Sequence, residues 1–149
     1  MLNLEELERK DKLKTKVLKY IMYKKRTEQE VRRKFVAEDQ ELLDEVIENL
    51  KEIGYINDES YIERAVNEFM NLNNLSLKEL KYKLMAKGAK QNLIEDYISN
   101  HFEELEEYEI ASARNLIQKK QNGMEEQALI QFLLKKGYKM DSIKEAIRE

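Results

Sequence analysis

Apolar residues recur every three to four positions through most of the sequence, which is the period of an α-helix that buries one face. The clearest case is the segment 58–72, whose apolar stripe consists of Tyr61, Ile62, Ala65, Val66, Phe69 and Met70. Similar patterns predict helices over about residues 13–25 and 105–121. Each of these segments is followed by two shorter helical patterns, so the periodicity indicates a repeated architecture.

Two of the shorter pairs are close copies of each other. When the sequence is aligned on Gly88 and Gly137, the equivalent apolar residues are Leu80 and Leu129, Leu84 and Leu133, Ile94 and Ile143, and Ile98 and Ile147. This spacing predicts two amphipathic helices, with the glycine in the left-handed conformation that ends the first of them. Residues 27–50 form a weaker copy, which is two residues shorter at the corner and lacks the glycine.

Polar residues at the helix starts give the same register. Three predicted capping boxes pair a polar residue with a glutamate three positions later: Thr27 with Glu30, Ser76 with Glu79, and Asn122 with Glu125. Their spacing gives a period of about 46 to 49 residues. We therefore predict an all-α chain of three tandem three-helix repeats that form an elongated, curved array. The predicted parts are an N-terminal extension over 1–11 and repeats over 12–56, 57–103 and 104–149.

The stretch 54–59 interrupts the helical pattern and is predicted to join the first two repeats. Gly54 ends one helix, Ile56 folds back over that helix end, and Asn57 caps the next helix. Asp58 then lies in the first turn, where the helix dipole favours negative charge. A calcium loop would need further oxygen ligands at alternate positions, and none follow in that pattern.

The apolar stripes also predict the core. On the helix after Thr27, Arg32 and Arg33 are expected to point outward because Val31 and Phe35 occupy the buried stripe. The residues expected to be mostly buried are Val31, Phe35, Ile47, Phe69, Leu84, Ile94, Leu133 and Ile143.

Composition supports the helical prediction and argues against catalysis. The 149 residues include no proline, no cysteine and a single histidine, His101. Thiol catalysis, disulfides and cysteine-ligated metals are excluded, and no second histidine supports a nucleophile–histidine pair. The acidic run 102–109 is expected to be a solvated helix start and not a metal site. We therefore expect no enzyme activity, no metal and no cofactor.

The chain carries no pattern of a targeted or membrane protein. Its N-terminal residues mix acids with bases and include no apolar core of a signal peptide. The longest mostly apolar run, 128–134, is far shorter than the roughly 20 residues that span a bilayer. A cytoplasmic protein without membrane contact is expected.

Charge is strongly segregated, although the net charge is only −3. Between residues 12 and 34 there are ten basic residues and two acidic ones. Such a local positive field attracts phosphates or an acidic protein surface, whereas the simpler interpretation is a solvated helix face. With smaller clusters in the later repeats, the candidate binding residues are Lys24, Lys25, Arg26, Arg32, Arg33, Lys34, Lys78, Lys81, Lys83, Lys87, Lys135 and Lys136.

Three stretches resemble motifs of the RecX family of bacterial RecA regulators. They are YKKRTEQEVRRKF at 23–35, LKEIGYINDESYI at 50–62 and FLLKKGYKMDSIKEAI at 132–147. The first resembles a basic turn followed by a capped helix, the second a Gly-Tyr joint, and the third a Lys-Lys-Gly-Tyr ending. Their order and the repeat period extend the resemblance over about residues 11–149.

The resemblance implies a non-enzymatic monomer that binds in the helical groove of the RecA–DNA filament and mainly limits its ATPase, strand-exchange and coprotease activities. It thereby implies a role in DNA recombination, DNA repair and the SOS response. Many family members are basic overall, whereas this chain has a pI near 5.5, so only weak, non-specific binding to nucleic acid, namely single-stranded DNA within the filament, is expected. A DNA-binding helical module and a helical-repeat scaffold for another protein remain as alternatives.

Overall fold

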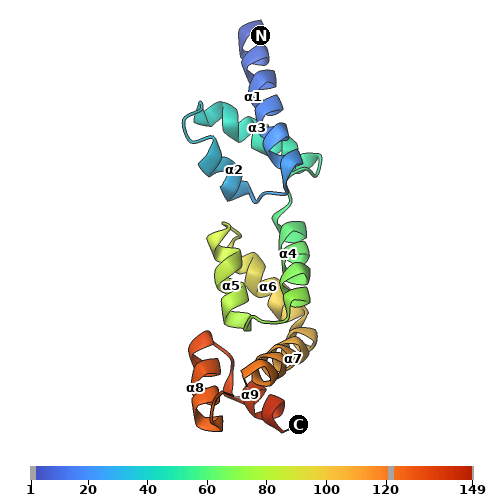
Figure 1. The fold of residues 1–149 in the computed structure, drawn as a ribbon. Coiled ribbons are helices and arrows are strands. Elements are labelled where there is room, and N and C mark those ends of the chain that lie inside the picture. Colours follow the sequence, from blue (N-terminus) through green and yellow to red (C-terminus); the bar gives the residue numbers. More distant parts are fainter. Residues whose placement is uncertain (1–2, 121–122, 149) are drawn as a thin grey trace.

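The computed structural model describes residues 3–120 and 123–148, and these form nine α-helices and no strand (Figure 1). The helices are α1 (Leu4–Tyr23), α2 (Glu28–Lys34), α3 (Gln40–Glu52), α4 (Asp58–Leu72), α5 (Leu77–Ala86), α6 (Gln91–Asn100), α7 (Phe102–Lys120), α8 (Glu126–Lys136) and α9 (Met140–Ile147). The all-α prediction is confirmed.

The molecule is elongated, with α1 to α3 at one end and α7 to α9 at the other (Figure 1). The same contact recurs along it, since α1 packs against α3, α4 against α6, and α7 against α9. The short helices α2, α5 and α8 follow one another down the same side (Figure 1). No helix in the described part of the chain is long and apolar enough to cross a membrane.

The buried apolar residues of the described chain form three separate clusters. The first lies between Leu13 and Ile56, the second between Ile62 and Tyr108, and the third between Ala113 and Ala146. Six of the eight predicted core residues are buried: Val31, Ile47, Leu84, Ile94, Leu133 and Ile143. Phe35 and Phe69 are only partly buried at the edges of their clusters.

Phe35 is less buried than expected because its helix is short. Helix α2 ends at Lys34, so Phe35 forms the C-cap and not part of a continuous stripe. Its ring lies edge-on to Tyr20 of α1, with the ring centroids 5.8 Å apart.

Most of the predicted helix ends are confirmed. Thr27 and Ser76 form complete capping boxes, and the Asn57 side chain accepts a hydrogen bond from the Ser60 amide. Gly88 and Gly137 have φ values of 91° and 103°, in the left-handed region that a helix-ending glycine provides. The joint at 54–59 therefore connects two helices, as the sequence indicated.

Three predicted helix starts differ from the structure. Helix α1 begins at Leu4 with Asn3 as its cap, so residues 4–11 of the predicted extension belong to this helix. Helix α7 begins at Phe102, slightly before the predicted start. Helix α8 begins at Glu126 with Glu125 as its N-cap, whereas the predicted capping box places Glu125 inside the helix; Asn122 lies outside the described residues.

Candidate nucleic-acid and partner interface

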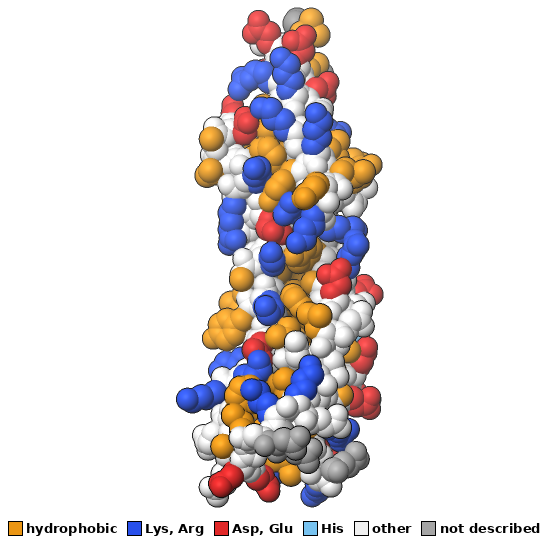
Figure 2. Space-filling view, viewed as in Figure 1, with side chains coloured by type: hydrophobic (Ala, Val, Ile, Leu, Met, Phe, Trp, Pro, Cys, Tyr) orange, Lys and Arg blue, Asp and Glu red, His pale blue; other side chains and the backbone are white. Residues whose placement is uncertain are grey.

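Basic side chains extend along one face of the molecule. Figure 2 shows Lys and Arg side chains from the α1 end down to the α8 end, with exposed hydrophobic side chains between them. In the lower half of this view, acidic side chains gather mainly along the edge formed by α4 and α7. The face therefore offers a positive field together with apolar contact area.

A groove that contains several of the candidate basic residues lies between the first and second core clusters. It has a volume of about 360 Å³, and we call it the junction groove. Its lining comes from the end of α1, one side of α4 and the end of α5, and consists of Tyr23, Lys24, Lys25, Tyr61, Arg64, Ala65, Glu68, Phe69, Leu84 and Lys87. Four basic residues and one acidic residue give this lining a local excess of positive charge.

A hydrogen bond across the junction holds the sides of this groove together. The Thr27 hydroxyl donates to the Lys87 carbonyl oxygen at 2.6 Å, and Thr27 is fully buried. Gly88 follows at a positive φ, and a Cβ there would lie 2.6 Å from the Cβ of Gln29. The glycine thus lets α5 end against the start of α2, which brings Lys87 to the same groove as Lys24 and Lys25.

Arg32 does not point freely outward as predicted. Its Nε donates to Glu28 at 3.0 Å and its Nη1 to Asp44 at 2.6 Å. The hydrogen bond to Asp44 is the main reason why the pKa of Arg32 is raised. Because a partner would have to compete with these two carboxylates, Arg32 serves the packing of α2 against α3.

Two further candidates also bind within the chain. The Arg26 guanidinium lies 4.1 Å from the Tyr20 ring centroid, and its side chain is only 17% exposed. The Lys136 ammonium donates to Glu79 at 3.2 Å, which links α8 to α5. Their charges hold neighbouring helices in place.

The remaining candidates are more accessible. Arg33 is exposed, and its Nη1 makes only a long 3.4 Å contact with the Ala86 carbonyl. Lys78 and the partly buried Lys81 border a small depression of about 240 Å³ on α5 and α6. Lys34, Lys83 and Lys135 are exposed at other places along the chain.

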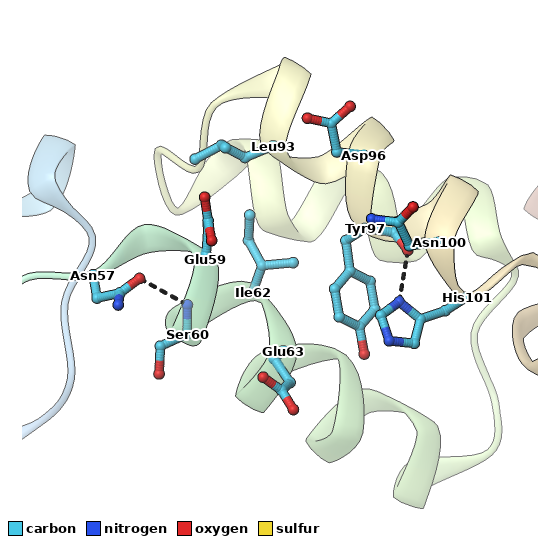
Figure 3. Close-up of a pocket in the computed structure, with 10 residues that line it drawn as sticks. All are labelled: Asn57, Glu59, Ser60, Ile62, Glu63, Leu93, Asp96, Tyr97, Asn100 and His101. Carbon is cyan, nitrogen blue, oxygen red and sulfur yellow. Dashed lines mark hydrogen bonds between the residues drawn. The ribbon is translucent and has the colours of Figure 1, made fainter.

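A second groove lies on the other side of α4 and has the opposite charge. This acidic groove, of about 470 Å³, lies between α4 and α6 and is lined by Asn57, Glu59, Ser60, Ile62, Glu63, Leu93, Asp96, Tyr97, Asn100 and His101 (Figure 3). His101 stacks on Tyr97, with the ring centroids 4.0 Å apart, and its Nδ1–H donates to the Tyr97 carbonyl oxygen at 2.9 Å. His101 is therefore a half-buried residue at a helix end.

One buried acid, Glu109, was not predicted from the sequence. Glu109 belongs to the acidic run that was predicted to be a solvated helix start, yet it is fully buried. Its carboxylate accepts hydrogen bonds from the backbone amides of Leu77 at 2.9 Å and Lys139 at 3.1 Å. Its position four residues after Leu105, on the buried stripe of α7, was the available signal.

Among the described residues, no group of three or more His, Asp and Glu side chains is arranged to hold a metal ion. No protein-family model matches the sequence. Individual curated proteins and solved structures do match it.

The curated relatives cover nearly all of this chain. It is 32% identical over 139 residues to "Regulatory protein RecX" of Staphylococcus haemolyticus, and this match covers 89% of this chain and 51% of the relative. It is 30% identical over 145 residues to "Regulatory protein RecX" of Clostridium perfringens, and this match covers 92% of this chain and 68% of the relative. The chain thus spans about half the length of its staphylococcal relatives.

Solved structures have the same fold. The crystal structure of RecX from Lactobacillus salivarius superposes with a TM-score of 0.84 and 25% sequence identity, and the match covers 95% of this chain and 96% of that one. A second crystal structure of regulatory protein RecX, at 21% identity and a TM-score of 0.81, supports the fold alone. The sequence identity to the clostridial relative and this agreement in fold show that the chain belongs to the RecX family of regulatory proteins.

Proposed function

We propose that this chain is a non-enzymatic regulator that binds the RecA–DNA filament and mainly limits its ATPase, strand-exchange and coprotease activities. The observation that carries the proposal is the similarity to proteins named regulatory protein RecX over about nine tenths of the chain. The extended basic face supports it, because a filament exposes DNA phosphates, and acidic protein surfaces would attract the same charges.

We also propose that the chain acts as a monomer built from three units, at 12–56, 57–103 and 104–149. The three core clusters and the recurring helix contacts support this division, with Leu105 and Tyr108 at the start of the third unit packing into the second cluster. A linear series of units would present basic residues from each unit to successive parts of a filament. In this arrangement, the exposed members of the candidate set make the contacts, and Arg26, Arg32 and Lys136 hold the units in shape.

The direct test is the RecA ATPase on single-stranded DNA, measured with increasing amounts of this protein at two salt concentrations. The parent protein is expected to lower the ATPase rate. The double variant Arg33→Glu/Lys34→Glu should weaken this inhibition, by about 2 to 5 kcal/mol of binding free energy if the contacts are desolvated. Both side chains are exposed, so each substitution should change folding stability by only about 0.5 kcal/mol.

The matched control is Lys119→Glu/Lys144→Glu, which makes the same change of charge at exposed positions outside the candidate set. It should inhibit nearly as well as the parent, with helicity checked by circular dichroism. If the parent leaves RecA activity unchanged, the proposed function is wrong. If both double variants lose inhibition equally, the effect is one of net charge, and the proposed contact through Arg33 and Lys34 is wrong.

A further inference from the structure

We propose that the junction groove binds a segment of single-stranded nucleic acid, with one base stacked on Tyr23 and the adjacent phosphates held by Lys24, Lys25 and Lys87. The inference rests on the proposed function, because it assigns to one groove the contact with DNA that a filament regulator makes. It goes further by naming the groove and the role of an aromatic side chain.

Aromatic side chains line part of the groove. Tyr23 is 87% exposed at the last residue of α1, where a large ring contributes almost nothing to the core. Tyr61 and Phe69, both half-buried on α4, line the same groove. Unpaired bases stack on such exposed rings without regard to sequence, which is how single-stranded nucleic acid is commonly held.

Basic side chains line the same groove. Lys24 and Lys25 follow Tyr23 directly in the chain, so their charges border the place where a stacked base would lie. Lys87 reaches the groove from α5, and the Thr27 hydrogen bond to its carbonyl fixes its backbone. Cations that line the same groove as an exposed aromatic ring match a ligand in which each base is flanked by two phosphates.

The groove favours a single strand over the other anionic ligands. Its floor is apolar, with Leu84 almost fully buried and Ala65 partly so, and it suits the flat face of an unpaired base. Bases in a duplex are already stacked and paired, so only the phosphates of a duplex would use this site. An acidic peptide would likewise use the lysines and leave Tyr23 without a role.

The test measures binding of a fluorescent twelve-nucleotide oligothymidylate to the full chain, without RecA, at several salt concentrations. The parent should bind, and its affinity should fall steeply with salt. Tyr23→Ala should weaken binding about fivefold or more at every salt concentration, with the salt dependence unchanged. Lys24→Gln/Lys25→Gln should instead reduce the slope of log Kd against log salt, by up to about 0.7 for each lysine.

Two controls separate these effects from general changes. Tyr55→Ala removes another exposed tyrosine, and Lys119→Gln/Lys144→Gln removes two exposed lysines elsewhere. Both should bind the oligonucleotide like the parent. Tyr23→Phe should also keep full binding, because the ring and not the hydroxyl stacks on the base.

Four results would overturn the inference: no binding by the parent at low salt, equal binding by Tyr23→Ala, tighter binding of a duplex of the same length, or displacement of the oligonucleotide by a poly-glutamate peptide of equal charge. The RecA ATPase assay keeps this failure distinct from that of the proposed function. If the parent inhibits RecA but fails the oligonucleotide test, only the proposal for the groove is wrong. If the parent binds the oligonucleotide but leaves RecA activity unchanged, only the proposed function is wrong.

Discussion

Two contacts along the chain have the same geometry but different surroundings. At the upper junction, where α2 meets α5, the Thr27 hydroxyl donates to the Lys87 carbonyl at 2.6 Å. At the lower junction, where α5 meets α8, the Ser76 hydroxyl donates to the Lys136 carbonyl at 2.7 Å. In both, the hydroxyl belongs to a capping box and the carbonyl precedes a left-handed glycine. A single sequence pattern therefore both caps a helix and joins it to the next part of the chain.

An acid from a long helix completes each junction, and here the two differ. At the upper junction, Asp58 of α4 accepts from the Glu28 amide at 3.0 Å and is only partly buried. At the lower junction, Glu109 of α7 accepts from the Leu77 amide in a fully buried site. Tyr108 and Ser112 lie beside it and donate to the Leu75 carbonyl.

This difference separates two ways of holding the chain together. The buried lower junction depends on satisfied hydrogen bonds, because a donor left without a partner there has no access to water. The upper junction is more exposed to solvent, and ion pairs of Glu28 with Lys51 and Arg32 surround it. Salt and pH should therefore act mainly on the upper junction, whereas truncations should be more harmful at the lower one.

The largest expected effect is at the lower junction. Glu109→Ala should lower the free energy of unfolding by about 3 kcal/mol or more, because it leaves the buried amide of Leu77 and the partly buried amide of Lys139 without acceptors. The equivalent change at the upper junction, Asp58→Ala, should cost only about 1 kcal/mol, since water can reach the Glu28 amide. Urea unfolding followed by circular dichroism measures both.

Glu109→Gln is the control for size, because it keeps one carbonyl oxygen but turns an amide NH₂ group toward the second donor. It should be more stable than Glu109→Ala and less stable than the parent. Equal losses for Glu109→Ala and Asp58→Ala would show that burial does not distinguish the two junctions.

The glycines provide the next test. Gly54, Gly88 and Gly137 all have positive φ, but a Cβ would meet nothing within 4 Å at Gly54. At Gly88 and Gly137 it would lie 2.6 Å from Gln29 and 2.8 Å from Lys78, in each case from the Cβ atom. Gly54→Ala should therefore cost about 1 to 2 kcal/mol from the left-handed backbone alone. The two junction variants should cost about 1 to 3 kcal/mol more, because the helices must move apart.

Thermal unfolding of the three variants measures this difference. Gly88→Ala should also weaken oligonucleotide binding, because it displaces Lys87 from the junction groove, whereas Gly137→Ala should leave that binding unchanged. If all three alanine variants lose the same stability, the close contacts at Gly88 and Gly137 add nothing to the cost of the substitution.

Much of this organisation could be predicted from the sequence because it is encoded locally. A capping box or a helix-ending glycine is specified within a few residues, so Thr27, Ser76 and Gly88 were identified correctly. The start of α8 was not identified correctly. The predicted box with Glu125 fits the pattern as well as the other two boxes do, and a sequence does not show long-range contacts.

The candidate site was less predictable for the same reason. Helical spacing correctly placed Arg33 outside, but it could not reveal that Asp44 of the next helix holds Arg32. The junction groove combines residues that are more than 60 positions apart in the chain, from Tyr23 to Lys87, and only the packing of α5 against α2 brings them together. Charge counts find basic segments, whereas partners within the fold decide which of these charges are available.

The smallest expected effect is the pH dependence of the upper junction. Burial raises the pKa of the Glu28 carboxyl, but hydrogen bonds from Lys51 and Arg32 outweigh it, so its pKa in the folded protein lies below the usual 4.5. Glu28 therefore contributes stability that is fully present above pH 4.5 and is lost as the pH falls through the folded value. Glu28→Gln should cost about 0.5 to 1 kcal/mol at pH 7, and this difference from the parent should shrink below pH 4.5.

Asp58 should show the opposite sign at the same junction. Burial raises the pKa of its carboxyl above the usual 3.8, and the hydrogen bond from the Glu28 amide offsets only part of this. Its contribution is therefore present below pH 3.8 and is lost as the pH rises through the folded value. Asp58→Asn keeps the acceptor oxygen and removes the partly buried charge, so its stability relative to the parent should rise between acidic and neutral pH. Unfolding curves of both variants from pH 3 to pH 7 measure these trends. If the stabilities of parent and variants change in parallel with pH, neither carboxyl has a shifted pKa at the junction.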